Sequence, residues 1–251
     1  MKIIDCHINI SSNGSWFNTK YDASYDNIIR KINNSGIYKG VLIAMPGACS
    51  NDFFYKDLID REKFWIFGNI DFDNIEKSFK QITELKLDGV KIHPRFQRIS
   101  INELDQLGIF SRVNDLCLPL MICGWQQSST IYIEDICPLK IDIFSKKYQN
   151  IKFIISHLGG HKFWDAFTVA RSNENVFLDC SYFLKFFKNT SLENDFFNIL
   201  SSIDKKVLYG SDFPEVSILN YKEYFIQKTK SINSSKLDNI LFRNINTLLN
   251  N

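Results

Sequence analysis

The chain has 251 residues, of which 45% are hydrophobic and 23% are charged, and its formal net charge is +2 at pH 7. The length is ample for one large core, and the composition is that of a globular protein. The net charge is too small, and its charges too evenly spread, to indicate binding to nucleic acid or to an anionic membrane. No apolar run approaches the roughly 18–20 residues that a membrane-spanning helix needs.

The cysteines are scattered, and no pair has the C-x-x-C spacing of a zinc knuckle or a redox motif. We therefore expect free thiols in a protein of the reducing cytoplasm, without a secretory signal. The six residues concerned are Cys6, Cys49, Cys117, Cys123, Cys137 and Cys180.

Short apolar segments alternate with helical patterns along the whole chain. The predicted strands are 2–7, 40–45, 64–70, 89–93, 120–124, 152–157, 176–180 and 206–209. The predicted helices are 24–34, 52–60, 75–87, 102–116, 141–148, 162–172, 193–203, 219–231 and 236–249. This alternation predicts a parallel sheet, and eight repeats favour closure into one α/β domain over residues 1–251, a (β/α)8 TIM barrel with an extra C-terminal helix. The alternative, an open doubly wound sheet, would be expected to show a glycine-rich loop after its first strand, and none is present.

Polar residues gather at the end of the first predicted strand. Side chains alternate along a strand, so Asp5, His7 and Asn9 are expected on one face and Cys6 on the other. In a (β/α)8 barrel the active site lies at the carboxyl ends of the strands. We therefore interpret this face as part of an active site, although a turn or a buried, hydrogen-bonded histidine would also explain it.

Other polar residues end strands four, six and eight. His93 and His157 end two of them, and Asp212 follows the last. Strands one and eight are neighbours in a closed barrel, so His7 and Asp212 should meet, either as a hydrogen-bonded pair or as two ligands of a divalent metal. Lys91 shares the face of His93, and a lysine inside the barrel mouth should form a salt bridge, to Asp5 or Asp212, or take part in catalysis.

The loops after strands four and five carry candidate binding residues. Arg95 offers a guanidinium for a carboxylate or phosphate. Trp125, with Gln126 and Gln127, suits a polar ring such as a sugar, although an ordinary solvated loop is the alternative. The loop after the first strand contains Trp16 and Phe17, which we expect to be exposed.

Together these segments resemble a known family. Asp5-Cys6-His7, GVKIHPRFQ (89–97), SHLGG (156–160), YGSDFP (209–214) and FRNINTLLN (242–250) resemble the amidohydrolase-related TIM-barrel hydrolases. Within them the chain is most similar to the branch of the aminocarboxymuconate-semialdehyde decarboxylase-like enzymes. The resemblance covers the whole chain in the right order.

The resemblance implies one divalent metal, often zinc. Its usual ligands are two histidines of strand one, a histidine of strand five and an aspartate of strand eight, with a catalytic histidine before the Gly-Gly pair. Residue by residue, His7, Asp212 and His157 match this pattern. The chain departs from it at Asn9 and Cys123, which stand where the second and third histidines are expected.

Because of these two departures, the sequence does not decide whether a metal is bound or which residues would bind it. His7, Asp212 and Cys123 could hold zinc or manganese with water in the fourth position, with strand parity placing Cys123 on the face of Trp125. His93 could also replace a missing ligand. Alternatively no metal is bound, as in metal-independent lactonases of the family. Lys91 or Arg95 would then polarise a carbonyl group while Asp212 activates water.

We expect a hydrolase that cleaves a C–O or C–N bond of a lactone, ester or amide in a small polar or anionic substrate, with or without a metal. Asp212, His157 and Lys91 are the expected catalytic residues. The expected substrate-binding residues are His93, Arg95, Trp125, Gln126 and Asn9. The alternatives are a metal-dependent non-oxidative decarboxylase and a barrel that binds a ligand without catalysis. The expected partner is a small molecule, and self-association is left open.

Overall fold

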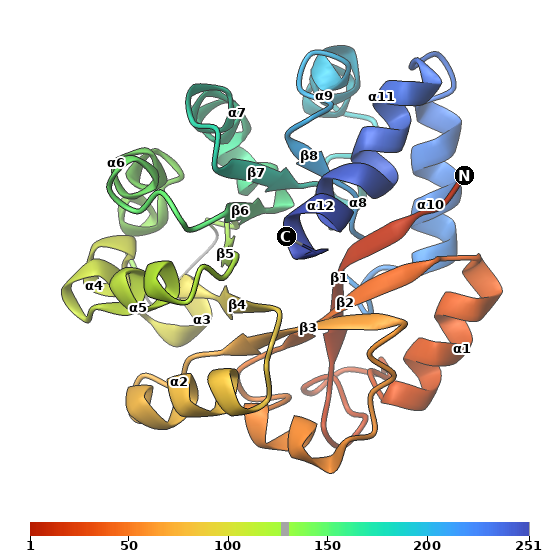
Figure 1. Ribbon diagram of the computed structural model, residues 1–251. Helices are drawn as coiled ribbons and strands as arrows, with labels where there is room; N and C mark the ends of the chain where they lie inside the picture. Colours follow the sequence, from red (N-terminus) through yellow and green to blue (C-terminus); the bar gives the residue numbers. More distant parts are fainter. Residues whose placement is uncertain (127–130, 251) are drawn as a thin grey trace.

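The computed structural model describes residues 1–126 and 131–250. It contains one sheet of eight parallel strands, which pair in chain order, β1 to β8 (Figure 1). The strands are β1 (Ile4–Ile10), β2 (Lys39–Ala44), β3 (Phe64–Asn69), β4 (Gly89–Ile92), β5 (Leu120–Cys123), β6 (Phe153–Ser156), β7 (Val176–Asp179) and β8 (Val207–Leu208). Almost every strand residue is buried, as expected for a parallel sheet covered on both faces. The predicted TIM barrel is confirmed.

The barrel closes between its first and last strands through single backbone hydrogen bonds. The amide of Cys6 donates to the carbonyl oxygen of Tyr209 over 2.9 Å. The amide of Asp212 donates to the carbonyl oxygen of His7, also over 2.9 Å. Asn9 N and Phe213 O form a third bond of 2.8 Å. Because β8 has only two residues, the segment after it completes the closure, and this brings Asp212 beside His7.

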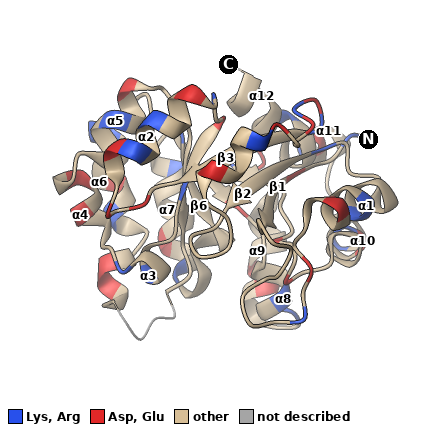
Figure 2. Ribbon diagram, turned by 90° about the horizontal axis from the view of Figure 1, so that it is seen from below, with Lys and Arg blue, Asp and Glu red and all other residues tan. Residues whose placement is uncertain are grey.

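The helices surround the barrel, and Figure 2 shows basic and acidic segments intermixed on them. They are α1 (Tyr25–Ser35), α2 (Ile75–Glu84), α3 (Pro94–Gln97), α4 (Ile101–Gln106), α5 (Ile109–Asp115), α6 (Leu139–Lys147), α7 (Phe163–Ser172), α8 (Phe183–Phe186), α9 (Ser191–Leu200), α10 (Ile218–Lys228), α11 (Ser234–Asp238) and α12 (Asn244–Asn250). Tighter or wider turns form η1 (Asn51–Lys56), η2 (Ile133–Ile136), η3 (His157–Lys162) and η4 (Asn239–Arg243). No helix among the described residues is long and apolar enough to cross a membrane.

Three predicted helices differ from those observed. The last of them, 236–249, is divided into α11, the π-helical turn η4 and α12. The predicted helix 102–116 is divided into α4 and α5, because Gly108 between them has a left-handed backbone with φ of 71°. The predicted helix 52–60 is only the 3-10 turn η1, which ends at Asp57, also left-handed with φ of 51°. The short helices α3 and α8, at the mouth of the barrel, were not predicted.

The core has two layers. The larger layer lies between the strands and the surrounding helices, and the smaller one fills the inside of the barrel. The inner layer includes Ile4, Val41 and Met121, and Ile245 of α12 packs against it. Helix α12 therefore covers the amino-terminal end of the barrel (Figure 1). The opposite end, where the strands terminate, stays open for a site.

Candidate active site

A cavity of about 760 Å³ opens at the carboxyl ends of the strands. Most residues that the sequence singled out line it, although they come from strands far apart in the chain. Those lining the cavity are His7, Asn9, Lys91, His93, Arg95, Trp125, His157 and Asp212. Gln126 is buried beside the cavity, where its side-chain amide donates to the carbonyl of Gly124. Gln127 lies outside the described residues.

The prediction that Asp5 shares a strand face with His7 and Asn9 is wrong. The register between β1 and β2 shifts between Asp5 and Ile8, which marks a bulge that breaks the simple alternation of side chains. Cys6 consequently belongs to the inner layer of the barrel, while His7 and Asn9 line the cavity. Asp5 is fully buried between β1 and the segment after β8, where its Oδ1 accepts hydrogen bonds from the amides of His7 (3.1 Å) and Ser211 (2.9 Å).

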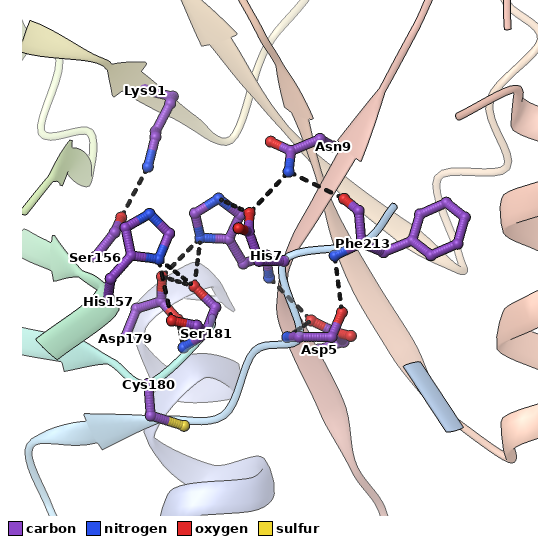
Figure 3. Close-up of polar contacts among 12 residues, drawn as sticks. Asp5, His7, Asn9, Lys91, Ser156, His157, Asp179, Cys180, Ser181 and Phe213 are labelled. Carbon is purple, nitrogen blue, oxygen red and sulfur yellow. Dashed lines mark hydrogen bonds and ion pairs between the residues drawn. The ribbon is translucent and has the colours of Figure 1, made fainter. Parts of the chain in front are cut away.

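His7 is held between two carboxylates. Its Nδ1 lies 2.7 Å from Asp179 Oδ2 (Figure 3). Its Nε2 lies 3.3 Å from Asp212 Oδ1. Burial, and then the positive charge of Lys91, lower the pKa of His7, against the opposing effect of the two aspartates. The neutral ring that this favours donates its Nδ1 proton to Asp179 and leaves a lone pair on Nε2. The Nε2 lone pair then faces Asp212 Oδ1, so a proton that reaches either atom can be shared between them.

Asp179 and Ser181 are site residues that the sequence reasoning missed. The Asp179 carboxylate accepts from the Ser181 hydroxyl (2.8 Å) and amide (2.7 Å), in addition to His7. Burial opposes its ionisation, but His7 outweighs burial, so the pKa of Asp179 is below its usual range. Its position as the last residue of an apolar strand, β7, was a usable signal. A Cβ on the neighbouring Gly210 would lie 2.9 Å from Asp179 Oδ1, so only glycine permits this close packing.

Asp212 presents its carboxylate to the cavity with 13% of its side chain exposed. Its backbone is left-handed, with φ of 72°. Asn9 fixes the carboxylate, because its Nδ2 donates to Asp212 Oδ1 (2.9 Å) as well as to the carbonyl of Phe213 (3.0 Å). Asn9 thus acts as a hydrogen-bond donor to Asp212 in this arrangement. Figure 3 shows its other bond, to the carbonyl of Phe213.

Lys91 is 1% exposed and lies in the lining of the cavity. Its ammonium donates to the Ser156 hydroxyl over 2.8 Å. The salt bridge expected with Asp5 or Asp212 is not formed among the described residues. Burial lowers the pKa of Lys91. A negatively charged group bound in the cavity would oppose this effect and favour the ammonium form.

Cys123 is buried at the end of β5, and the imidazoles of His93 and His157 act on its thiol. Burial opposes its ionisation, but the two imidazoles together lower the pKa of Cys123 well below its usual range. Burial would lower the pKa of His157, but the hydrogen bond and charge of Cys123 raise it. His157 Nδ1 lies 3.0 Å from the carbonyl oxygen of Ser181, to which it donates, so the ring orientation is fixed.

The residues fit a metal incompletely. Among the described residues one group offers three ligand atoms within 4.8 Å of one another, and it consists of His7, His157 and Asp179. This set differs from the expected His7, Asp212 and Cys123. The Ser181 hydroxyl already lies 2.8 to 3.1 Å from all three of its members, so a metal would have to displace it.

The more open pair also falls short of a metal site. His7 Nε2 and Asp212 Oδ1 face each other at 3.3 Å, but catalytic zinc sites generally have three protein ligands. The neighbouring Asn9 turns its amide protons, and not its oxygen, toward Asp212. The donor set of this arrangement therefore does not fit a bound metal.

Aromatic side chains enclose the cavity. Trp125 packs edge-on against Tyr182, with ring centroids 5.2 Å apart. Trp16, expected to be exposed, is 4% exposed, because its loop folds over the cavity and its indole Nε1 donates to Glu215 Oε1 over 3.2 Å. Phe17 does remain partly exposed.

Comparison with solved structures supports the fold. An uncharacterised TIM-barrel protein from Bordetella bronchiseptica is 18% identical with a TM-score of 0.83, covering 99% of this chain and 98% of that one. A probable 2-pyrone-4,6-dicarboxylic acid hydrolase from Acinetobacter baumannii is 16% identical with a TM-score of 0.70 and 99% coverage of both chains. A 5-carboxyvanillate decarboxylase from Sphingomonas paucimobilis is 11% identical with a TM-score of 0.67, covering 99% and 98%.

The sequence comparisons decide the family. None of the curated proteins matches the chain. The aminocarboxymuconate-semialdehyde decarboxylase-like branch stays a prediction. The profile of the amidohydrolase family matches residues 46–224, which is more than half of the sequence. The chain therefore belongs to the amidohydrolase family.

Proposed function

We propose that this protein hydrolyses a C–O or C–N bond of a carbonyl group, in a lactone, ester or amide, of a small anionic substrate. The observation that carries the proposal is the placement of Asp212, whose carboxylate reaches the cavity while Asn9 and His7 hold one of its oxygens. A carboxylate positioned in this way is suited to act as a general base. Membership of the amidohydrolase family supports the reaction class.

In the proposed reaction, Asp212 accepts a proton from a water molecule, which attacks the carbonyl carbon. The contact between Asp212 Oδ1 and His7 Nε2 gives that proton a second acceptor. The Nδ1 bond to Asp179 keeps the His7 ring in place during this transfer.

The attack creates a negative charge on the carbonyl oxygen. Lys91 lies in the cavity lining with its ammonium held by Ser156, and a fixed charge in a buried site stabilises such an oxyanion. His157 then supplies a proton to the leaving group. The raised pKa of His157 favours its protonated form, and the bond to Ser181 orients it. No step of the proposed reaction depends on a metal.

The rim of the cavity favours an anionic substrate. Arg95 and Arg98 line it, and a guanidinium binds a carboxylate through paired hydrogen bonds. One structural neighbour is named for the hydrolysis of 2-pyrone-4,6-dicarboxylic acid, which is a lactone with carboxylates. Lactones with carboxylate substituents are therefore the first compounds to test, and this neighbour supports the expected lactonase activity.

The test is a panel of carboxylated lactones, esters and amides, with products analysed by mass spectrometry. Addition of one water identifies hydrolysis, whereas loss of carbon dioxide identifies the decarboxylase alternative. On a hydrolysed substrate, we expect Asp212→Asn and His157→Ala each to reduce kcat by roughly 10²–10⁴-fold, because each removes a proton-transfer group.

The control is Asp115→Asn, an exposed carboxylate at the end of α5, which should leave kcat unchanged. Full activity of both Asp212→Asn and His157→Ala would contradict the proposed roles. If no member of the panel is converted, the barrel that binds without catalysis becomes the better explanation.

A further inference from the structure

The cavity has a basic side and an acidic side. Lys91, Arg95 and Arg98 lie within or just after β4, whereas Asp212 and Glu215 follow β8, and all five line the cavity. The strands pair in the order β1 to β8 and the barrel closes between β8 and β1, so β4 and β8 stand on opposite sides of the mouth (Figure 1). The charges are therefore separated across the site.

Glu215 carries the charge at the rim of the acidic side. Its Oε1 accepts the indole proton of Trp16, and among the described residues its carboxylate forms no ion pair. Lys185 donates to the backbone carbonyl of Glu215 (3.0 Å) and not to its carboxylate. The Lys185 ammonium also lies 5.1 Å from the centre of the Tyr182 ring.

A carboxylate next to aromatic rings is a favourable place for an ammonium group. Trp16, Tyr182 and Glu215 all line the cavity, so a ligand amine can contact both the charge and the ring faces.

The basic side also contains a buried polar atom without a hydrogen-bond partner among the described residues. His93 lines the cavity with only 7% of its surface exposed, and its Nδ1 has no hydrogen-bond partner among the described residues. A buried polar atom without a partner is costly, so it indicates a ligand group that completes it. Both sides of the cavity thus have polar groups that a ligand can satisfy.

We infer that the substrate is a zwitterion, in which a carboxylate binds on the Arg95 and Arg98 side and a protonated amine binds at Glu215. This inference rests on the proposed function for the chemistry, and among carboxylate-bearing substrates it selects those that also carry a protonated amine. A dianion would instead place its second negative charge against Glu215 and Asp212. Like charges repel, so the dianion should bind less tightly than the zwitterion.

The test uses three probes with chains of similar length and different ends: 4-aminobutanoate, glutarate and pentanoate. Their affinities for the full chain are measured by isothermal titration calorimetry or ligand-observed NMR. We expect 4-aminobutanoate to bind about fivefold more tightly than pentanoate, which is typical of one partly exposed ion pair, and glutarate to bind more weakly than either.

Glu215→Gln should abolish this preference and leave the affinity for pentanoate unchanged. Glutamine keeps an oxygen that can accept the Trp16 proton, so the loop should stay in place. Glu223→Gln, the same change on the exposed face of α10, is the matched control and should behave like the unmodified protein. Lys185→Met should strengthen the preference for 4-aminobutanoate, because it removes a competing ammonium.

The inference is overturned if glutarate binds better than 4-aminobutanoate, if Glu215→Gln weakens all three probes equally, or if no probe binds detectably. Arg98→Met tests the binding of the carboxylate that all three probes share. It should reduce the affinity for each probe by a similar factor. Failure of the proposed function appears separately, as full hydrolysis by Asp212→Asn. Binding of the probes requires no hydrolysis, so the two results are independent.

Discussion

Asp212 and His157, the two proposed proton-transfer residues, share an unusual backbone conformation. Both have positive φ angles, 72° for Asp212 and 58° for His157. His157 comes directly after β6, and Asp212 lies in the segment that follows β8. Such conformations cost roughly 1–3 kcal/mol for residues other than glycine, and they are found preferentially at functional sites. Here they turn the two side chains into the cavity at the point where the strands stop.

Asp5 gives a prediction at the scale of one residue. Burial raises the pKa of Asp5 to about 7, so the folded protein retains a proton that the unfolded chain has already lost. A raised carboxyl pKa contributes stability that is lost as the pH rises through the folded pKa. The free energy of unfolding should therefore fall, relative to that of Asp5→Asn, by about 3 kcal/mol between roughly pH 5 and pH 8.

Chemical denaturation of the two proteins at both pH values checks this expectation. Other titrating groups are common to both proteins and largely cancel in the difference. Asp115→Asn, at an exposed position, should follow the unmodified protein. A pH dependence of Asp5→Asn identical to that of the unmodified protein would show that Asp5 is ionised when folded.

At the scale of elements, the two ends of the barrel have different tasks. The carboxyl ends of the strands hold the cavity, while α12 covers the other end through Ile245, which is fully buried against Ile4 and Leu208. Stability and chemistry should therefore be separable by mutation. The bulge in β1 contributes to the candidate site. Because of it, two consecutive side chains face the inside of the barrel: Cys6 lies in the inner layer and His7 lines the cavity.

Ile245→Ala tests this separation. The substitution removes buried methyl and methylene groups and should lower the free energy of unfolding by about 2–5 kcal/mol. The value of kcat/KM below the unfolding transition should stay the same, because α12 is at the far end of the barrel. Thr247→Ala, an exposed change on the same helix, should alter neither quantity. A large loss of activity in folded Ile245→Ala would show that the two ends are coupled.

At the scale of the whole molecule, barrel closure assembles the site. Asn9 and Asp212 are 203 positions apart in the chain, yet they share a hydrogen bond of 2.9 Å. Closure also sets the charge balance of the mouth, in which Lys91 places a positive charge near His7. That charge, together with the short list of ligand atoms, disfavours a bound cation at His7 and Asp212.

Elemental analysis and activity after exhaustive dialysis against EDTA test this consequence. We expect a metal content well below one ion per chain and an unchanged hydrolysis rate, because the donors present are too few for a catalytic zinc site. About one zinc or manganese per chain, lost in both Asp212→Ala and Cys123→Ala, would instead establish the metal set that the sequence suggested.

The sequence alone determined the architecture, because hydrophobic periodicity is a local property that each segment carries by itself. It also predicted that Lys91, His93, His157 and Asp212 come together, since they stand at or near predicted strand ends and strand ends converge in a barrel, and all four line the candidate cavity. Strand parity, however, did not reveal the bulge that moves Asp5 away from the cavity.

Only the tertiary structure decided which of these groups are partners. It placed Asp179 behind His7, gave Lys91 the Ser156 hydroxyl in place of a carboxylate, and brought two histidines to act on Cys123. It also folded Trp16 onto Glu215, from the opposite end of the chain. These pairings depend on how the closed barrel packs residues of distant strands and loops, which no local pattern of the chain encodes.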